Sequence, residues 1–192
     1  MKTITKTLSL LVLATLLGGC AAAVVGGAAT GVAVAHDRRT AGTVLDDQSI
    51  ELKSYNLIGS NQQLEANSHI NVTSYNLRVL LTGEVTSNAL KSKAAQLVSS
   101  VPKTRQVLNY LVVGPNTPLG SRTKDTWITT KVKSNLFNIE LADFDATRVK
   151  VVTEAQTVFL LGLVNRQEGQ AAIEVARKVS GVKKVVALFE YV

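Results

Sequence analysis

The hydrophobic pattern of the chain contains one repeated unit. Residues 78–99 and 157–180 follow the same plan 79 positions apart: an alternating apolar strand, a short polar turn and an amphipathic helix. Each strand carries a glycine near its end, Gly83 in the first copy and Gly162 in the second. A repeat of this length predicts one supersecondary unit that is present twice.

The two strands can be divided by face, because alternate side chains of a strand point to opposite sides. The glycines share a face with the most apolar side chains, which are Val79, Leu81, Val85, Val158, Leu160 and Val164. We expect this face to form the core. A glycine there indicates that the packed helix comes very close to the strand, so a larger residue at Gly162 is expected to overpack the core.

The opposite faces of the two strands differ in polarity. The first strand presents Leu80, Thr82 and Glu84 there, whereas the second presents Phe159, Leu161 and Leu163. The second sheet is therefore apolar on both sides and must be covered on both. The other module is the simplest cover.

The flanking patterns complete an αββαβ order in both halves of the chain. We predict a first module at residues 44–113, a linker at 114–121 and a second module at 122–192. Two prolines and two glycines within residues 114–120 predict a stretch without regular structure. The fold class is α+β, with each module a three-stranded mixed sheet packed on two helices.

Several boundaries are specific predictions. In the first module, Asp46 and Asp47 are expected to cap a helix that buries Ile50, Leu57 and Ile58 on one face. The remaining expected elements are a turn at 74–76, a strand at 107–113, a helix at 126–137, strands at 148–153 and 157–164, a helix at 166–180 and a strand at 184–192. Gly181 is expected to be the C′ residue of the helix at 166–180.

The N-terminal segment differs in composition from both modules. Lys2 and Lys6 precede an apolar run too short to span a bilayer, and small residues lead into Cys20. This pattern resembles the lipobox of bacterial lipoproteins, which implies a signal peptide at residues 1–19 and a lipidated Cys20. The alternatives are an uncleaved anchor and a cysteine placed there by chance.

The residues after Cys20 refine this expectation. Ala21 replaces the aspartate that is associated with inner-membrane retention, so the outer membrane is the expected destination. Residues 20–43 are expected to form a tether, flexible or lying along the membrane, although Gly27 and Gly31 have the spacing of a helix-pairing motif. Cys20 is the only cysteine, which excludes a disulfide framework and a thiol catalyst from the mature chain.

With these elements in place, the chain resembles the dual-BON outer-membrane lipoproteins. The residues that carry the resemblance are Cys20, the strand–glycine segments 79–83 and 158–162, the segment DTWITTKV at 125–132 and VSGVK at 179–183. The resemblance covers essentially the whole chain, and DTWITTKV is its most specific part. It implies that the second module binds anionic phospholipid, phosphatidylglycerol in particular. It also implies a role in envelope integrity and placement at the division site.

The helix after Asp125 suits such a role by its residue types. Ile128, Val132, Leu136 and Ile139 form its inward stripe, while Trp127, Lys131 and Ser134 lie on a neighbouring flank. An indole beside ammonium groups is typical of the headgroup region of a membrane. The predicted lipid-binding residues are Lys124, Trp127, Ile128, Lys131, Val132, Lys133, Ser134 and Phe137. The alternative is that Trp127 covers the core and the lysines form a solvated face.

The first module departs from this pattern. Ser49 stands where a counterpart of Trp127 is expected, so lipid contact through the first module is not predicted.

Charge and candidate chemistry narrow the function further. The net charge is +7, and +5 remains without Lys2 and Lys6, which is a modest excess. An exported lipoprotein without an aromatic-basic signature is a poor match for nucleic acid. His36 and His69 lack the partners of a zinc site, and no nucleophile-elbow or phosphate-binding glycine loop occurs. We therefore expect neither an enzyme nor a metal or other cofactor, and we expect a monomer.

Two functions of different classes remain. The first is a lipid-binding module that docks anionic phospholipid while Cys20 anchors the chain. The second is an adaptor that holds an envelope protein on its apolar sheet face or on a helix, such as the outer-membrane assembly machinery or a regulator of cell-wall hydrolases.

Overall fold

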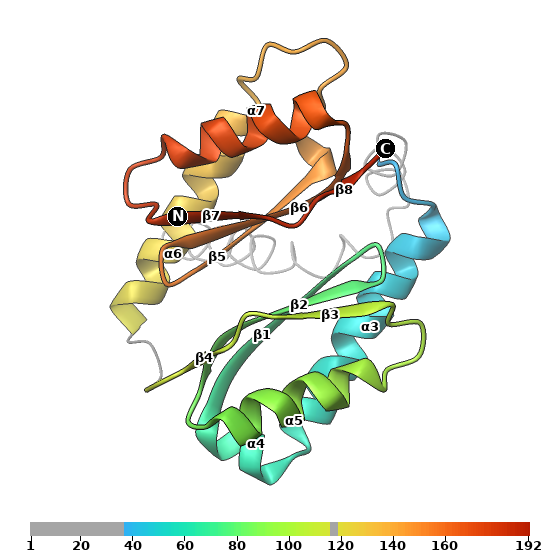
Figure 1. Ribbon diagram of the computed structural model, residues 1–192, viewed down its shortest axis with the longest axis vertical. Coiled ribbons are helices and arrows are strands. Elements are labelled where there is room, and N and C mark those ends of the chain that lie inside the picture. The colour runs from blue at the N-terminus through green and yellow to red at the C-terminus, as the bar shows by residue number, and fades with distance from the viewer. Residues whose placement is uncertain (1–36, 116–118) are drawn as a thin grey trace, which may run out of the picture. The chain divides into compact units, whose positions relative to one another are not determined.

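The structure, a computed structural model, describes residues 37–115 and 119–192 and shows two modules of the same plan (Figure 1). Cys20, His36 and most of the predicted tether lie outside the described residues. The first module contains α3 (Ala41–Gly59), α4 (Gln62–Asn67), β1 (Ser68–Tyr75), β2 (Arg78–Val85), α5 (Asn88–Ser99), β3 (Gln106–Asn109) and β4 (Val112–Val113). The second contains α6 (Leu119–Leu136), the 3₁₀ helix η3 (Ala146–Arg148), β5 (Val149–Glu154), β6 (Thr157–Val164), α7 (Arg166–Arg177), β7 (Lys184–Ala187) and β8 (Glu190–Tyr191).

Both modules confirm the predicted α+β class and use the same sheet topology. The central strand pairs antiparallel with its hairpin partner, β1 with β2 and β5 with β6. On its other side it pairs parallel with the last strand of the module. That last strand is broken in both copies, so the single strands expected at 107–113 and 184–192 are each two short ones. Leu111 and Phe189 lie in the breaks and enter the cores beneath the sheets.

Three further boundaries differ from the predictions. Helix α6 begins at Leu119, inside the expected linker, and α3 begins at Ala41, inside the expected tether. The short helix α4, which buries Leu64, was not predicted. Helix α7 ends at Arg177 with Lys178 as its C-cap, so Gly181 is not its C′ residue but lies in the turn that follows, with a φ of 89°.

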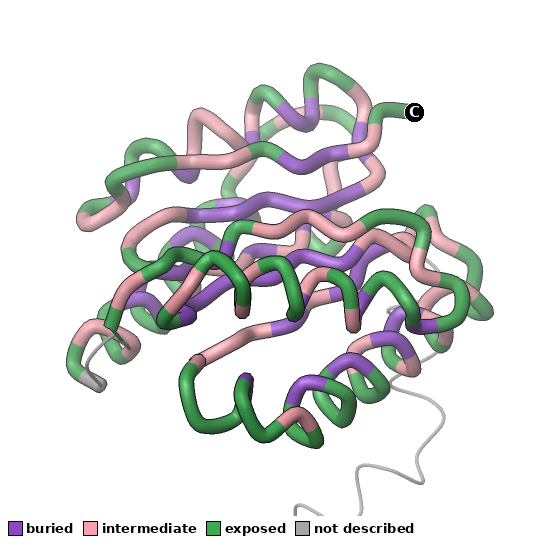
Figure 2. Tube along the Cα trace, turned by 60° about the horizontal axis from the view of Figure 1, so that its bottom comes forward, coloured by how far each residue is buried: buried purple, intermediate pink, exposed green. Residues whose placement is uncertain are grey.

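The predicted division of the strands into faces is confirmed. Val79, Leu81 and Val85 lie in the core of the first module, and the corresponding face of β6 lies in the core of the second. The opposite faces meet in a third cluster that joins the modules, built from Tyr75, Leu80, Phe159, Leu161 and Leu188. Figure 2 shows buried residues along the strands and on one side of the helices. The second apolar sheet face is therefore covered by the first module, as expected.

The two strand glycines are required for a different reason from the one predicted. A Cβ at Gly83 would lie 2.0 Å from the carbonyl oxygen of His69, and one at Gly162 would lie 2.7 Å from that of Arg148. The first oxygen belongs to the paired strand β1 and the second to the last residue of η3, directly before β5, so neither belongs to the helix α5 or α7 that packs on the sheet. The close neighbour is thus a main chain that cannot move aside as a side chain can.

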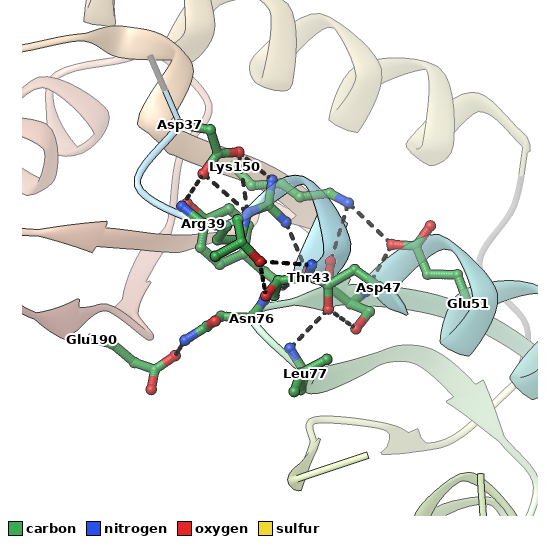
Figure 3. Close-up of polar contacts among 12 residues, drawn as sticks. Asp37, Arg39, Thr43, Asp47, Glu51, Asn76, Leu77, Lys150 and Glu190 are labelled. Carbon is green, nitrogen blue, oxygen red and sulfur yellow. Dashed lines mark hydrogen bonds and ion pairs between the residues drawn. The ribbon is translucent and has the colours of Figure 1, made fainter. Parts of the chain in front are cut away.

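A buried aspartate links the first helix of each module to the turn of its hairpin, and Figure 3 shows the first of them, Asp47. Asp47 accepts hydrogen bonds from the amides of Asn76 and Leu77, both at 2.8 Å. Asp125 accepts them in the same way from the amides of Ala155 and Gln156. The prediction that Asp46 and Asp47 cap the helix is therefore wrong, because Thr40 is the N-cap of α3. Ile50 and Ile58 are buried as predicted, but Leu57, which was expected on the same face, is exposed.

These four turn residues show why the carboxylate is needed. All have positive φ, between 47° and 64°, which is the left-handed conformation that non-glycine residues adopt at a cost. A carboxylate that takes two successive amides holds each turn in this shape.

Replacing Asp47 with alanine should therefore destabilise the first module. We expect a loss of about 2–4 kcal/mol in the free energy of unfolding, because two amides and the Ser74 hydroxyl lose a buried acceptor. Guanidinium denaturation measures this. Asp46→Ala is the matched control, since its pair with Lys103 is at the surface and should be worth less than about 1 kcal/mol. Equal effects of the two changes would contradict the assigned role.

Two consecutive arginines attach the start of the described chain to both modules. Arg38 donates to the carboxylate of Glu168 at 2.6 and 2.9 Å and to the carbonyl of Leu163. Arg39 donates to Asp47 at 2.8 Å and stacks 3.9 Å above the ring of Tyr75. Part of the segment expected to be a tether is thus fastened to the folded unit.

The Glu168 contact predicts a pH-dependent contribution to stability. Burial alone would raise the pKa of Glu168, but hydrogen bonds from Arg38 and from the Asn165 amide lower the pKa below its ordinary value. A lowered pKa stabilises the fold above the unfolded value of about 4.3, and this contribution disappears as the pH falls through the folded value. Glu168→Gln should therefore cost about 2 kcal/mol at pH 7 and progressively less below about pH 4.3.

Thermal unfolding of both proteins between pH 3 and 7 tests this expectation. The exposed Glu174→Gln is the control and should behave as the native chain does at every pH. A constant difference between Glu168→Gln and the native chain over that range would refute the assigned role.

Candidate functional site

Helix α6 carries all the predicted lipid-binding residues except Phe137, which directly follows its last residue, and its core stripe fixes its orientation. Ile128, Val132 and Leu136 recur every four residues and are at most 1% exposed. Ile139 packs against the same core. Ile128 and Val132, which we placed in the lipid-binding set, are therefore core residues. They hold the helix on its sheet and do not reach the surface, which corrects their assignment.

The opposite side of α6 presents an exposed strip formed by Lys124, Trp127, Lys131 and Ser134. These residues follow each other at intervals of three or four, so they share one side of the helix. The side chain of Trp127 is 48% exposed. The ammonium of Lys131 lies 5.9 Å from the centroid of the Trp127 ring, within the range of a cation–π contact. We call these four residues the Trp127 strip.

Lys133 and Phe137 belong to a different flank of the same helix. Together with Arg39, Tyr75 and Lys150 they line a hollow of about 290 Å³ beside the first module. Phe137 is 69% exposed at the end of α6. The structure thus separates the predicted set into a buried group, the Trp127 strip and this second flank.

The exposed surface of α6 carries basic side chains and no acidic side chain that would balance their charge. Its single acidic residue, Asp125, is buried and occupied by the hairpin amides. Within residues 37–115 and 119–192, neither Lys131 nor Lys133 lies within ion-pair distance of a carboxylate. Among the residues that the structure describes, Lys124 donates to the neutral side chain of Gln156, at 3.1 Å. The positive charges of this face are therefore available to an external anion.

The corresponding helix of the first module lacks this arrangement. Because Asp47 and Asp125 play the same part, Ser49 is the structural counterpart of Trp127, as the sequence indicated. Helix α3 instead exposes Leu45 and Leu52, at 65% and 63%. The two modules share a fold but present different surfaces.

Sequence reasoning missed three residues on one side of α6. Arg122, Thr126 and Thr129 line a pocket together with Lys133, which was predicted, and the other wall includes His69 on β1. Their spacing of three or four residues was visible in the sequence, but the pocket depends on the first module lying opposite. His69 was expected just before a strand and lies within one.

Other candidate chemistry finds little support in the described residues. Residues 37–115 and 119–192 contain no group of three histidine, cysteine or acidic side chains arranged to hold a metal ion. In the same two stretches, no helix combines the length and the apolar character needed to cross a bilayer.

Comparisons with known proteins agree with the two-module architecture. Residues 46–115 and 124–192 each match the BON domain family. The outer membrane lipoprotein DolP of Haemophilus influenzae is 43% identical over 187 residues, which cover 97% of this chain and 96% of that protein. A 21 kDa hemolysin of Actinobacillus pleuropneumoniae is 38% identical over 157 residues, covering 81% and 79% of the two chains.

Among solved structures, the C-terminal domain of CdsD, a structural protein of the type III secretion system of Chlamydia trachomatis, is 10% identical with a TM-score of 0.30. The alignment covers 73% of this chain and 96% of that one. This likeness is too weak to inform the function.

Proposed function

Because the chain belongs to the BON-domain family and carries two BON domains, we propose that it is an outer-membrane lipoprotein that binds anionic phospholipid, phosphatidylglycerol in particular, through α6. In this proposal Cys20 carries the lipid anchor, and the folded modules face the periplasm. Lipid binding by the second BON domain supports outer-membrane integrity and enriches the protein at the division site. We propose no catalytic role.

The observation that carries the proposal is the exposure of Trp127 between lysines that have no acidic partner on the helix. A tryptophan that served only to cover the core would bury most of its ring, whereas 48% of this side chain is exposed. Indole rings favour the interface between headgroups and acyl chains. The Trp127 strip therefore has the composition of a surface that rests on a membrane.

The charges of α6 support an anionic lipid over a zwitterionic one. Each basic residue close to an anionic surface contributes about 1 kcal/mol, and this contribution falls off within a Debye length. Lys124 and Lys131 flank the ring directly, and Lys133 lies on the adjoining flank. Two or three such contacts, added to the burial of the indole, give weak but selective binding that the Cys20 anchor would reinforce by proximity.

Vesicle flotation tests the proposal. Residues 37–192 form one structural unit that contains all three hydrophobic clusters, so the chain from Ala21 onward is a suitable unlipidated form. We expect it to float with vesicles containing phosphatidylglycerol, to stay behind with pure phosphatidylcholine, and to lose binding as salt rises. Equal flotation with both vesicle types would contradict a charge-dependent site.

A second candidate function is favoured by the exposed leucines of α3. The apolar sheet face that an adaptor was expected to use is buried between the modules. Leu45 and Leu52 remain as an apolar surface on the first BON domain, which an envelope protein could cover. This function predicts co-purification that survives the loss of lipid binding and is lost when both leucines are replaced with glutamate.

A further inference from the structure

A polar pocket of about 470 Å³ lies between α6 and the first BON domain. Its size falls within the range of small-molecule sites. The residues on which the inference rests are His69, Asn71, Arg122, Thr126, Lys133 and Glu154. We call it the inter-module pocket.

Two nitrogens of residues that line the pocket have no hydrogen-bond partner in the described chain. They are the Nε of Arg122 and the Nδ1 of His69, and both are buried. The carboxylate nearest to His69 Nδ1, that of Glu84, is 3.8 Å away, too far for a hydrogen bond. Buried polar atoms without partners are costly and uncommon, so neither side chain is fully satisfied by the described residues.

Two cations of α6 give the pocket a preference for an anion. Arg122 and Lys133 lie about three helical turns apart on α6, and both line the pocket. Neither makes an ion pair with a described carboxylate. Arginine matches the geometry of a phosphate group particularly well, because its donors form a planar fork.

The same pocket offers acceptors, which an anion alone would not use. The hydroxyls of Thr126 and Thr130 donate to backbone carbonyls at 3.1 and 3.0 Å, so their oxygens remain able to accept. Glu154 is 8% exposed and takes a 2.8 Å hydrogen bond from Asn71. Burial raises the pKa of Glu154, opposed by the Asn71 hydrogen bond. The other acidic residue of the lining, Asp125, is already occupied by backbone amides.

We propose that the inter-module pocket binds a phosphate ester that carries free hydroxyl groups, of the glycerol phosphate type. The phosphate pairs with the guanidinium of Arg122, with Lys133 supplying charge, and the hydroxyls donate to Glu154 and the threonines. Inorganic phosphate fits less well because it lacks the glycerol hydroxyls that reach Glu154 and the threonines while the phosphate pairs with Arg122. A neutral polyol fits less well because it leaves the two cations without an anion.

This inference goes beyond lipid contact through the Trp127 strip, since the pocket is on another flank of α6. The same chemical group can come from two sources. One is the headgroup of phosphatidylglycerol, and the other is a free phosphate ester.

Calorimetric and NMR titration of the chain from Ala21 onward with sn-glycerol 3-phosphate tests the proposal. We expect saturable binding that shifts the amides of His69, Thr126 and Glu154, and binding of inorganic phosphate that is about tenfold weaker. Arg122→Gln should weaken glycerol phosphate binding about tenfold, whereas the matched surface change Arg177→Gln should leave it unchanged. Glu154→Gln should reduce the difference in affinity between glycerol phosphate and inorganic phosphate. Circular dichroism checks the fold of each variant.

Competition identifies the source of the group. If vesicles of phosphatidylglycerol displace glycerol phosphate, the pocket holds the lipid headgroup; if both bind together, it holds a free phosphate ester. The absence of saturable glycerol phosphate binding, or equal weakening by Arg122→Gln and Arg177→Gln, would overturn the pocket assignment. Either result leaves flotation with anionic vesicles as a separate test of the lipid-binding proposal.

Discussion

A chain that carries both Trp127→Ala and Lys131→Glu should lose detectable binding to phosphatidylglycerol vesicles while it keeps its thermal stability. The indole supplies the apolar contact, and reversal of Lys131 replaces an attraction of about 1 kcal/mol with a repulsion of similar size. Each single change should weaken binding about tenfold, because the affinity rests on few contacts. Both side chains are exposed, so neither change opens a cavity in the core. Flotation and differential scanning calorimetry measure the two quantities.

The repeat supplies a matched control for this pair. Lys53 occupies the position in α3 that Lys131 occupies in α6, and it is also exposed. Lys53→Glu changes the net charge by the same amount on the same fold. If Lys53→Glu weakened lipid binding as much as Lys131→Glu, attraction through overall charge would explain the data and the assignment to α6 would be wrong.

Replacing Gly83 with alanine should destabilise the first BON domain even more strongly than Asp47→Ala does. The added Cβ would meet the carbonyl oxygen of His69 at 2.0 Å, and Gly83 has a φ of 110°, which side-chain-bearing residues rarely adopt. Overpacking against a backbone and the unfavourable dihedral together predict a loss of about 3–5 kcal/mol in the free energy of unfolding. Guanidinium denaturation is the direct measurement.

Two other glycines calibrate this prediction. Gly59, at the end of α3, has nothing within 4 Å of an added Cβ, so Gly59→Ala should change stability by less than about 1 kcal/mol. The loss of stability for Gly162→Ala should lie between the losses for the other two. The added Cβ would be 2.7 Å from a carbonyl oxygen, but Gly162 does not have a positive φ. Similar losses for Gly59→Ala and Gly83→Ala would contradict the role assigned to the backbone contact.

Features that follow from local periodicity could be predicted from the sequence. The alternation in 78–85 and 157–164 assigned both faces of each central strand correctly, including the covered second face of β6. The four-residue spacing of Ile128, Val132 and Leu136 placed the core side of α6. These patterns are informative because burial imposes the period of the element on the sequence.

Features that depend on a distant neighbour could not be predicted in this way. Asp47 reads as a helix cap because the sequence does not show the hairpin turn that its carboxylate holds. Gly83 is interpreted from the sequence as a contact with the packed helix. The sequence does not show that the carbonyl beside it belongs to residue 69 on the pairing strand. The burial of Ile128 did not depend on a distant neighbour, because its place on the inward stripe of the helix already excluded it from a lipid-facing surface.

The candidate site shows the same division. Trp127, Lys131 and Ser134 are neighbours on one helix, and their common exposure follows from the position of the core stripe. The inter-module pocket needs β1 of the first domain opposite α6 of the second, and that arrangement comes from the packing of the two outer sheet faces. No sequence pattern within either domain predicts this arrangement.

The most direct test of the central claim is an NMR titration of the chain from Ala21 onward with micelles that contain or lack phosphatidylglycerol. The account predicts that phosphatidylglycerol shifts the Trp127 indole and the amides around Lys124, Lys131 and Ser134, while the exposed face of α3 stays unchanged. Unperturbed signals from α6, or shifts centred on Leu45 and Leu52, would contradict lipid recognition by the second BON domain.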